Sequence, residues 1–96
     1  MDTRFEWDDQ KATGNLTKHS VSFDEAATVF DNPLAAIFDD AAHSADEIRE
    51  VIIGHSAQGR LLVVVFTERA ESVVRIISAR QANKRERYDY EENIHI

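Results

Sequence analysis

The chain of 96 residues has no cysteine, one proline and three glycines. The absence of cysteine excludes a disulfide framework, a thiolate metal site and a cysteine nucleophile. With 43% hydrophobic and 30% charged residues, the composition is typical of a globular chain and not of a disordered or repetitive one. We expect a single domain over residues 1–96, with one hydrophobic core.

Long apolar runs are also missing. The longest, residues 61–66, is far shorter than the roughly 20 residues that span a bilayer. The acidic residues near the amino terminus argue against a signal peptide. We therefore expect a cytoplasmic protein without membrane contact.

The charge is unevenly distributed along the chain. Residues 1–50 hold four basic and twelve acidic side chains, whereas residues 51–96 hold seven and six. Residues 73–88, with five basic side chains and one acidic, carry +4 in a chain of net charge −7. Because phosphate attraction follows the local field of Lys and Arg, we expect any RNA site at this stretch. The acidic half suits a basic protein partner equally well.

A first helix is expected over residues 9–19, after a short β-prone piece at residues 4–7. Asp8 offers a side-chain cap for this helix. Its apolar line comprises Ala12, Leu16 and His19, beside a polar line of Lys11, Asn15 and Lys18.

A second helix is expected to begin at a capping box formed by Ser22 and Glu25. In such a box the serine hydroxyl accepts the Glu25 N–H, and the Glu25 carboxylate reaches back to the Ser22 N–H. The helix ends near Asp31, because the residue before Pro33 is pushed away from helical geometry.

The remaining pattern favours strands followed by one more helix. Strands are expected at residues 34–38, 49–55, 60–67 and 73–79, joined as an antiparallel meander. The run at 61–66 shows no alternation, which indicates a central strand covered on both faces. Asn83 and Glu86 cap a third helix over residues 84–92, too short to be stable unless it docks. The fold class is α+β.

Arg75 lies in a predicted strand whose alternation places it with Val73, Ile77 and Ala79 on one face. An arginine among apolar side chains must be paired or face a cavity, and its N–H donors suit phosphate. Two interpretations stay open: a phosphate ligand, or an ion pair with a carboxylate across the sheet.

Arg80 is expected at the junction between the last strand and the third helix, with Glu86 and Arg87 about two helical turns later. Together they offer positive charge for a phosphate and a carboxylate for proton transfer. The same charge run is also typical of a solvated helix face.

His19 is a candidate acid or base, because an imidazole changes its protonation near neutral pH. Its position in line with Leu16 suits a packed, hydrogen-bonded histidine equally well. His43, His55 and His95 have no metal-like spacing, so we expect neither a metal site nor a cofactor.

Three stretches together resemble the BrnT family of type II toxins. They are WDxxKxxxNxxKHxVSF from residue 7, GRLLVV from residue 59, and RIISAR from residue 75 with a following Glu-Arg pair and Tyr88. The resemblance covers residues 5–91. It implies a RelE-like α+β ribonuclease that cleaves RNA and arrests translation until its antitoxin, BrnA, covers it.

The same resemblance implies a heteromeric complex, often with two copies of each protein, in which only the antitoxin contacts DNA. Metal-free RNA cleavage needs a base for the 2′-hydroxyl proton, cations for the phosphate and an acid for the leaving oxygen. We expect Arg75 and Arg80 to stabilise the phosphate, and Glu86 or His19 to transfer protons. The expected RNA contacts are Lys11, Lys18, Lys84, Arg87 and Tyr88, the last either stacking on a base or orienting the substrate.

Two residues depart from the family pattern. Ser20 stands where glycine usually follows Lys-His, so the turn after the first helix is expected to differ. Gln81 stands where lysine is common, which removes one positive charge from the candidate site. Two main functions stay open. One is a ribonuclease, either fully active, weakened, or dependent on the ribosome with ribosome-associated mRNA as its substrate; the other is a catalytically silent module that binds an antitoxin or nucleic acid. A scaffold role in a larger complex ranks third.

Overall fold

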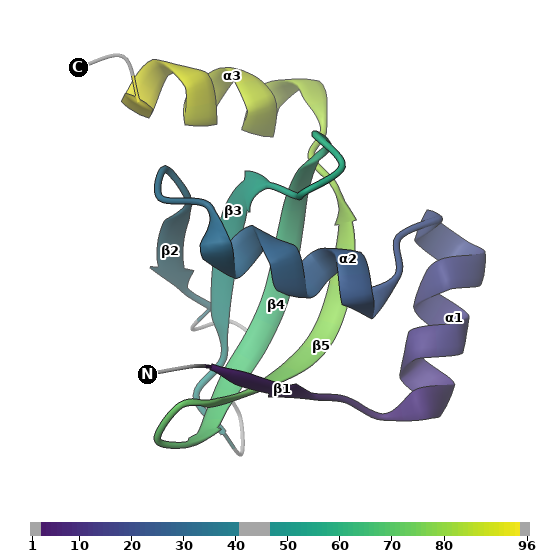
Figure 1. Ribbon diagram of the computed structural model, residues 1–96. Coiled ribbons are helices and arrows are strands. Elements are labelled where there is room, and N and C mark those ends of the chain that lie inside the picture. The colour runs from purple at the N-terminus through teal and green to yellow at the C-terminus, as the bar shows by residue number, and fades with distance from the viewer. Residues whose placement is uncertain (1–2, 41–46, 95–96) are drawn as a thin grey trace.

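The computed structural model describes residues 3–40 and 47–94 (Figure 1). Within these residues the elements, in chain order, are β1 (Arg4–Glu6), α1 (Asp9–His19), α2 (Phe23–Thr28), the 3₁₀ turn η1 (Val29–Asp31), β2 (Ala36–Asp39), β3 (Glu50–His55), β4 (Leu61–Ala70), β5 (Val73–Gln81) and α3 (Lys84–Ile94). These elements confirm the expected α+β class. His43, His95 and most of the predicted turn at residues 39–47 lie outside the described residues.

The five strands form one sheet in the order β1-β5-β4-β3-β2. Strands β2 to β5 pair antiparallel, which confirms the predicted meander. The N-terminal strand joins the outer edge of β5 in parallel, with Arg4 opposite Val73 and Glu6 opposite Arg75. The sheet is therefore mixed, and the pairing of β1 attaches the amino-terminal segment to β5, the last strand.

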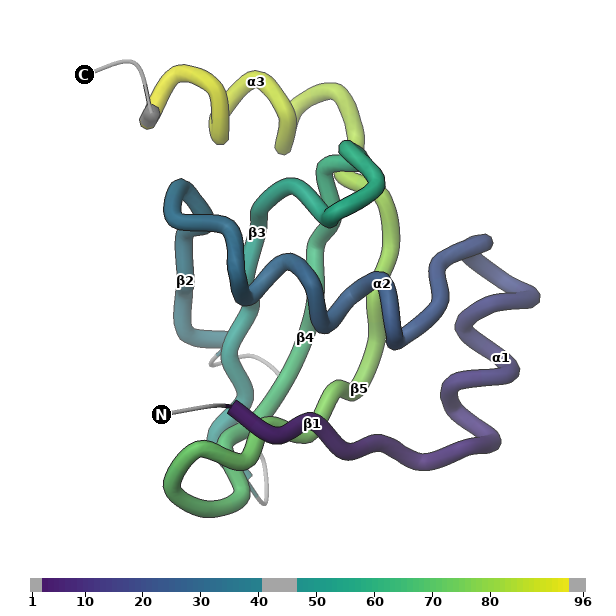
Figure 2. Tube along the Cα trace, viewed as in Figure 1, coloured from purple at the N-terminus to yellow at the C-terminus, as the bar shows by residue number. Residues whose placement is uncertain are grey.

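Helix α2 and η1 cover one face of the sheet, and α1 stands beside β5 (Figures 1 and 2). Aromatic rings fill the space between these layers: Phe30 lies 5.1 Å from Phe5 and 4.9 Å from Phe66, ring centre to ring centre. The buried core consists of Val21, Phe23, Ala26, Val29, Ile52, Leu62, Val64, Phe66, Val74, Ile76 and Ala79.

Strand β4 occupies the centre of the sheet, as its unbroken apolar run predicted. Four consecutive residues, Leu61, Leu62, Val63 and Val64, are all buried, so both faces of the strand are covered there. Burial of this kind is the main favourable term in folding a chain of this size.

A β-bulge in β5 changes which residues share a face. Val65 pairs with Ser78, but the next residue, Phe66, pairs with Ile76, so Ile77 is an extra residue in the ladder. The predicted alternation is wrong beyond this point. Ala79 lies in the core together with Ile76, instead of sharing a face with Arg75.

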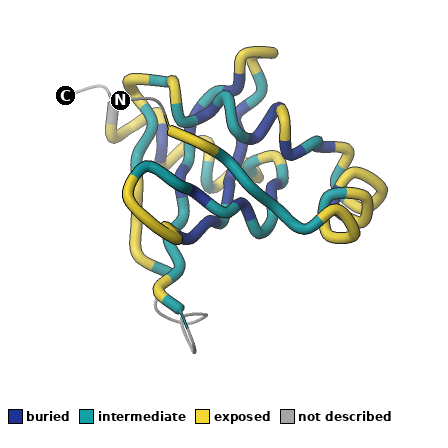
Figure 3. Tube along the Cα trace, turned by 60° about the horizontal axis from the view of Figure 1, so that its bottom comes forward, coloured by how far each residue is buried: buried dark blue, intermediate teal, exposed yellow. Residues whose placement is uncertain are grey.

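Helix α1 begins at the predicted cap, where Asp8 Oδ1 accepts the Lys11 N–H at 3.0 Å. The predicted apolar line is confirmed at Ala12, which packs against the core, and wrong at Leu16, which is half exposed; the buried residue of this helix is Asn15. Figure 3 shows exposed positions dominating α1, in contrast to the central strands β3, β4 and β5. The hydrogen bonds of Asn15 and the packing of Ala12 therefore hold this largely exposed helix beside the sheet.

Helix α3 begins with the predicted reciprocal cap. Asn83 Oδ1 accepts the Glu86 N–H at 2.8 Å, and Glu86 Oε1 accepts the Asn83 N–H at 2.9 Å. The helix docks through Tyr90, which is buried, donates its hydroxyl to the Leu34 carbonyl at 2.9 Å and packs edge-on against the His55 ring. The expectation that this helix must dock is confirmed.

Candidate functional site

Arg80 and Glu86 meet where β5 gives way to α3. Arg80 Nη1 donates to Glu86 Oε1 at 2.7 Å, and Nη2 donates to Oε2 at 2.8 Å. The Arg80 side chain is 42% exposed and that of Glu86 26% exposed. The predicted junction therefore contains a two-pronged ion pair that solvent, or a ligand, can reach.

The electrostatics of this pair follow from its geometry. The hydrogen bonds from Arg80 lower the pKa of Glu86, against an opposing effect of burial, and the Asn83 N–H lowers it further. The Glu86 hydrogen bond in turn raises the pKa of Arg80. At neutral pH the site therefore holds a carboxylate and a guanidinium, with the arginine fixed in place by its partner.

Asn15 attaches α1 to the same end of β5. Its Nδ2 donates to the Ala79 carbonyl at 2.8 Å and to the Val21 carbonyl at 2.9 Å, while its Oδ1 accepts the Ala79 N–H at 3.0 Å. The amide thus bonds both backbone groups of Ala79, as a neighbouring strand would. The sequence placed Asn15 on a polar line with Lys11 and Lys18; the two lysines are exposed, but the burial of Asn15 was not predicted.

This attachment brings the end of α1 towards the junction. His19 lies one turn after Asn15 on the same helix face, and Arg80 follows Ala79 directly. Figure 1 shows α1 running in the same direction as β5, so Lys18 and His19 lie at the end of β5 that carries Arg80. His19 is partly buried and Lys18 exposed.

Arg75 and Lys11 lie away from this end of the molecule. Arg75 is five residues before Arg80, which corresponds to roughly 15 Å of strand. Its Nη1 donates to Glu6 Oε2 of the neighbouring β1 at 2.9 Å, so the structure contains the ion pair across the sheet. Lys11, in the first turn of α1, is separated from Lys18 by about 10 Å of helix. Their roles towards RNA stay predictions.

The remaining predicted RNA contacts belong to α3. Lys84 and Arg87 are exposed close to the Arg80–Glu86 pair in the chain. Tyr88 is 62% exposed, and its side chain lines an apolar groove between α3 and β2. The structure therefore joins Arg80 to Glu86, places Lys84 and Arg87 within one helical turn of Glu86 along α3, and places Tyr88 at the groove.

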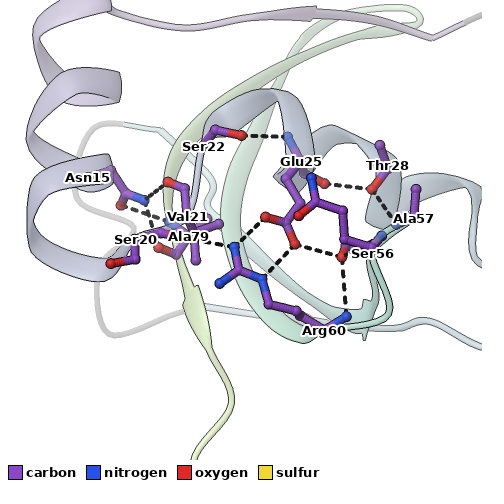
Figure 4. Close-up of polar contacts among 11 residues, drawn as sticks. Asn15, Ser20, Val21, Ser22, Glu25, Thr28, Ser56, Ala57, Arg60 and Ala79 are labelled. Atoms are coloured by element: carbon purple, nitrogen blue, oxygen red, sulfur yellow. Dashed lines mark hydrogen bonds and ion pairs between the residues drawn. The ribbon is translucent and has the colours of Figure 1, made fainter.

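A second arginine site was missed by sequence reasoning. Arg60 donates through Nε to Glu25 Oε2 at 2.9 Å and through Nη2 to Glu25 Oε1 and to the Ser20 carbonyl, the latter at 3.0 Å (Figure 4). Ser56 Oγ donates to Glu25 Oε2 at 2.7 Å. The network joins α2, the end of α1 and the β3–β4 hairpin.

Glu25 is the centre of this network. Its N–H donates to Ser22 Oγ at 3.0 Å, which confirms half of the predicted capping box. Its carboxylate binds Arg60 and Ser56 instead of turning back to the Ser22 N–H, and the Arg60 hydrogen bond lowers its pKa. Arg60 directly precedes the most buried strand, but no local pattern in the sequence identifies Glu25, 35 residues away, as its partner.

Ser20 ends α1 in the left-handed conformation, with φ 59° and ψ 30°. Its N–H donates to the Leu16 carbonyl at 2.9 Å. Serine therefore adopts the backbone conformation that a glycine favours at a helix end, at some cost in strain. The expected change of turn is not needed.

Neither a metal cluster nor a membrane-spanning helix occurs within residues 3–40 and 47–94. No group of three or more His, Asp or Glu side chains there is arranged to hold a metal ion. None of the helices in that part of the chain has the length and apolar content required to cross a membrane.

The fold and the site define a small α+β protein whose half-exposed Arg–Glu pair stands beside a basic helix start. A family model described as the ribonuclease toxin BrnT of type II toxin–antitoxin systems matches residues 7–86. The chain belongs to this family of ribonuclease toxins, which confirms the resemblance seen in the sequence. Membership in a type II system implies an antitoxin partner.

A solved structure shares the fold. The 1.1 Å crystal structure of the Brucella abortus ribonuclease toxin BrnT matches with a TM-score of 0.66 and 21% identity, covering 85% of this chain and 99% of that chain. At this identity the likeness shows the fold alone. Comparison with curated proteins finds no match.

Proposed function

We propose that this chain is an endoribonuclease that cleaves RNA without a metal ion, inhibits translation in the cytoplasm and is neutralised by a BrnA-type antitoxin. The observation that carries the proposal is the half-exposed Arg80–Glu86 pair at the β5–α3 junction. Family membership supports the toxin and ribonuclease parts of the proposal.

Arg80 supplies positive charge to the scissile phosphate. A guanidinium held in one orientation needs little rearrangement when negative charge develops on the phosphate oxygens, which is the most effective form of electrostatic stabilisation. Glu86 provides that orientation through both of its oxygens. We therefore assign Glu86 the role of a positioning residue for Arg80.

Between Glu86 and His19, His19 is the better candidate for proton transfer. The lowered pKa of Glu86 makes its carboxylate a weak proton acceptor, whereas an imidazole accepts and releases protons near neutral pH. His19 takes the proton of the 2′-hydroxyl as that oxygen bonds to phosphorus. The bond to the 5′-oxygen breaks, and this oxygen takes a proton from water. The hydroxide left behind takes the proton that His19 holds, which returns His19 to its starting state. The products are a 2′,3′-cyclic phosphate and a 5′-hydroxyl end.

RNA binding is assigned to cations around the same junction. Lys84 and Arg87 are exposed on α3, and Lys18 is exposed at the end of α1. Contacts of this kind neutralise backbone phosphates without reading sequence. Lys11 and Arg75 serve a longer substrate that extends along α1 and β5, and Tyr88 stacks on a base beyond α3.

The experiment is RNA cleavage by the purified chain, free of antitoxin, in the presence of EDTA. We expect single-stranded RNA to be cut and a cell-free translation reaction to stop. His19→Gln should lower the cleavage rate about 100-fold or more, because general base catalysis contributes on that scale. Mass spectrometry of the products should find the cyclic phosphate.

Intact RNA at high protein concentration would contradict the proposal and favour the second candidate, a silent module that binds the antitoxin. Full activity in His19→Gln would contradict the assignment of the base while leaving the ribonuclease in place. Loss of cleavage in EDTA that added magnesium restores would contradict metal independence.

A further inference from the structure

The Asn15 side chain joins α1, the segment that follows it and β5. Its Nδ2 donates to the Val21 carbonyl at 2.9 Å and to the Ala79 carbonyl at 2.8 Å, and its Oδ1 accepts the Ala79 N–H at 3.0 Å (Figure 4). Asn15 is buried, and Val21 and Ala79 are almost completely inaccessible to solvent. These bonds therefore end on parts of the molecule that belong to the core.

His19 lies inside the loop of chain that the Asn15 amide closes. The bond from Asn15 to Val21 spans six residues, and His19 is the last residue of α1 within that span. The turn that follows is fixed as well, because Ser20 takes the left-handed conformation and donates its N–H to the Leu16 carbonyl at 2.9 Å. The backbone on both sides of His19 is therefore held in one conformation.

The same amide relates His19 to Arg80. Ala79, which Asn15 bonds through both backbone groups, directly precedes Arg80 in β5. From the bonded pair, α1 rises about 6 Å to reach His19, and β5 advances about 3 Å to reach Arg80. Because α1 and β5 run in the same direction, both segments lead to the same end of the sheet (Figure 1). Asn15 therefore aligns the helix that carries the candidate base with the strand that carries the phosphate ligand.

The position of the His19 side chain depends on the backbone that carries it. Within residues 3–40 and 47–94, the structure shows no hydrogen bond or ion pair of the His19 imidazole. A catalytic base is usually oriented by a further hydrogen-bonded group. Here α1 has to supply that orientation, and Asn15 is the buried residue of this largely exposed helix.

We propose that Asn15 is a positioning residue that holds His19 at the distance from Arg80 that RNA cleavage requires, a proposal that rests on the ribonuclease function proposed above. The base and the cation have to act together, the base on the 2′-hydroxyl and the cation on the oxygens of the adjoining phosphate. A displacement of about 1 Å between such groups lowers a rate by as much as about 100-fold. In this role Asn15 contacts no substrate and acts only through His19.

The test measures cleavage of a short labelled RNA by the full chain. Asn15→Asp keeps the size of the side chain and an oxygen for the Ala79 N–H, but it replaces the amide nitrogen that donates to two carbonyls. We expect kcat to fall at least about tenfold. KM should change less than about threefold, because Lys84 and Arg87 on α3 are unaffected. The matched control is Asp8→Ala, which removes the cap at the opposite end of the same helix and should change kcat less than about twofold.

The same substitution in the His19→Gln background separates positioning from a general loss of structure. If Asn15 acts through His19, Asn15→Asp should change the residual rate of His19→Gln by less than about twofold. The rates are measured with protein in excess over RNA and compared per folded protein. The same loss in both backgrounds, or an Asn15→Asp protein that cleaves as the wild type does, would overturn the proposal.

Nuclear magnetic resonance tests the attachment without any cleavage. Asn15→Ala removes all three bonds, so the Ala79 amide should exchange with solvent at least about tenfold faster than in the wild type, and the His19 ring signals should shift. In Asp8→Ala both should stay as in the wild type. If Asn15→Ala does not fold, the His19 ring signals of Asn15→Asp give the same test. Unchanged exchange and unchanged ring signals would overturn the proposal, whatever the cleavage rates.

This proposal and the function on which it rests fail in different ways. A wild type that leaves RNA intact would refute the ribonuclease and, with it, the catalytic role of Asn15. Cleavage that depends on His19 but not on Asn15 would refute the positioning role alone. Cleavage that depends on neither residue would refute the assignment of the base together with that of its positioning residue.

Discussion

Arg60 and Arg80 each hold a glutamate through two nitrogens, but the two pairs have different surroundings. Glu25, the partner of Arg60, has a side chain only 3% exposed and also accepts from Ser56. Glu86, the partner of Arg80, is 26% exposed and lies in the first turn of α3, next in the chain to Arg85 and Arg87. The first pair connects three elements, whereas the second lies at one junction.

The difference separates structure from function. A buried carboxylate whose partners come from distant parts of the chain fixes how those parts meet, and its loss leaves uncompensated polar groups inside. A half-exposed pair contributes little to stability. Its arginine is nevertheless ordered and accessible, which is what stabilisation of a phosphate requires. We therefore regard Arg60–Glu25 as a structural pair and Arg80–Glu86 as the functional one.

The largest expected effect on stability comes from Glu25→Ala. The substitution leaves the Ser56 hydroxyl without its acceptor and Arg60 with only the Ser20 carbonyl, so we expect the free energy of unfolding to fall by about 2–3 kcal/mol. Glu86→Gln is the matched control, with a loss of about 1 kcal/mol or less. Urea denaturation measures both, and similar losses would remove the distinction between the two pairs.

The stability of the fold should also depend on pH, through three glutamates whose pKa values are shifted in the folded chain. The pKa values of Glu25 and Glu86 are lowered in the folded chain, so both carboxylates favour folding at neutral pH, and this contribution is lost as pH falls below the ordinary value of 4.5. Burial and the nearby acids Glu68 and Asp39 raise the pKa of Glu50, which acts in the opposite direction.

Urea midpoints measured from neutral pH down to about pH 3 should therefore decline in acid for the wild type. The decline should be shallower in Glu25→Gln and steeper in Glu50→Gln. An unchanged slope in Glu25→Gln would show that its pairing with Arg60 does not stabilise the fold.

RNA binding should depend on the exposed cations beside the functional pair. We expect Lys84→Ala and Arg87→Ala each to weaken binding severalfold and to reduce the salt dependence by about 0.7 in log–log slope for each phosphate that the variant no longer neutralises. Arg85→Ala is the control, because Arg85 is highly exposed and pairs with Asp89 one turn later. Fluorescence anisotropy with labelled RNA across salt concentrations distinguishes them. Equal salt-dependence slopes in all three variants would refute the assignment of Lys84 and Arg87 as RNA contacts.

The smallest expected effect is a gain. Ser20→Gly should raise the free energy of unfolding by about 0.5 kcal/mol, since glycine adopts the left-handed conformation more readily, and part of this gain is offset by a more flexible unfolded chain. Thermal unfolding measures the change. A loss of stability would mean that the serine side chain contributes more than its backbone costs.

The helix starts could be predicted from the sequence because their signals are local. Asp8, Ser22 and Asn83 each cap a backbone N–H three residues later. The strands could be predicted from apolar runs between turns. The central position of β4 could be predicted because its apolar run shows no alternation. Signals of this kind need no knowledge of the rest of the fold.

Features that depend on distant partners could not be predicted in the same way. Asn15 bonds Ala79, 64 residues away, and Arg60 bonds Glu25, 35 residues away, so neither partner is visible in a local pattern. The bulge at Ile77 reversed the face of Ala79 because it arises from pairing between two strands. The Arg80–Glu86 site could be predicted from the sequence because its two residues are only six positions apart.

The most direct test of whether Arg60–Glu25 is structural and Arg80–Glu86 functional compares the Arg60→Ala and Arg80→Ala variants. RNA cleavage and urea unfolding are measured on both. We predict that Arg80→Ala lowers the cleavage rate about 100-fold or more while its urea midpoint stays close to that of the wild type. Arg60→Ala should lower the midpoint clearly, and its remaining folded fraction should still cleave RNA. An Arg80→Ala protein that cleaves RNA at the wild-type rate, or that unfolds as readily as Arg60→Ala, would contradict the assignment of Arg80–Glu86 as the functional pair.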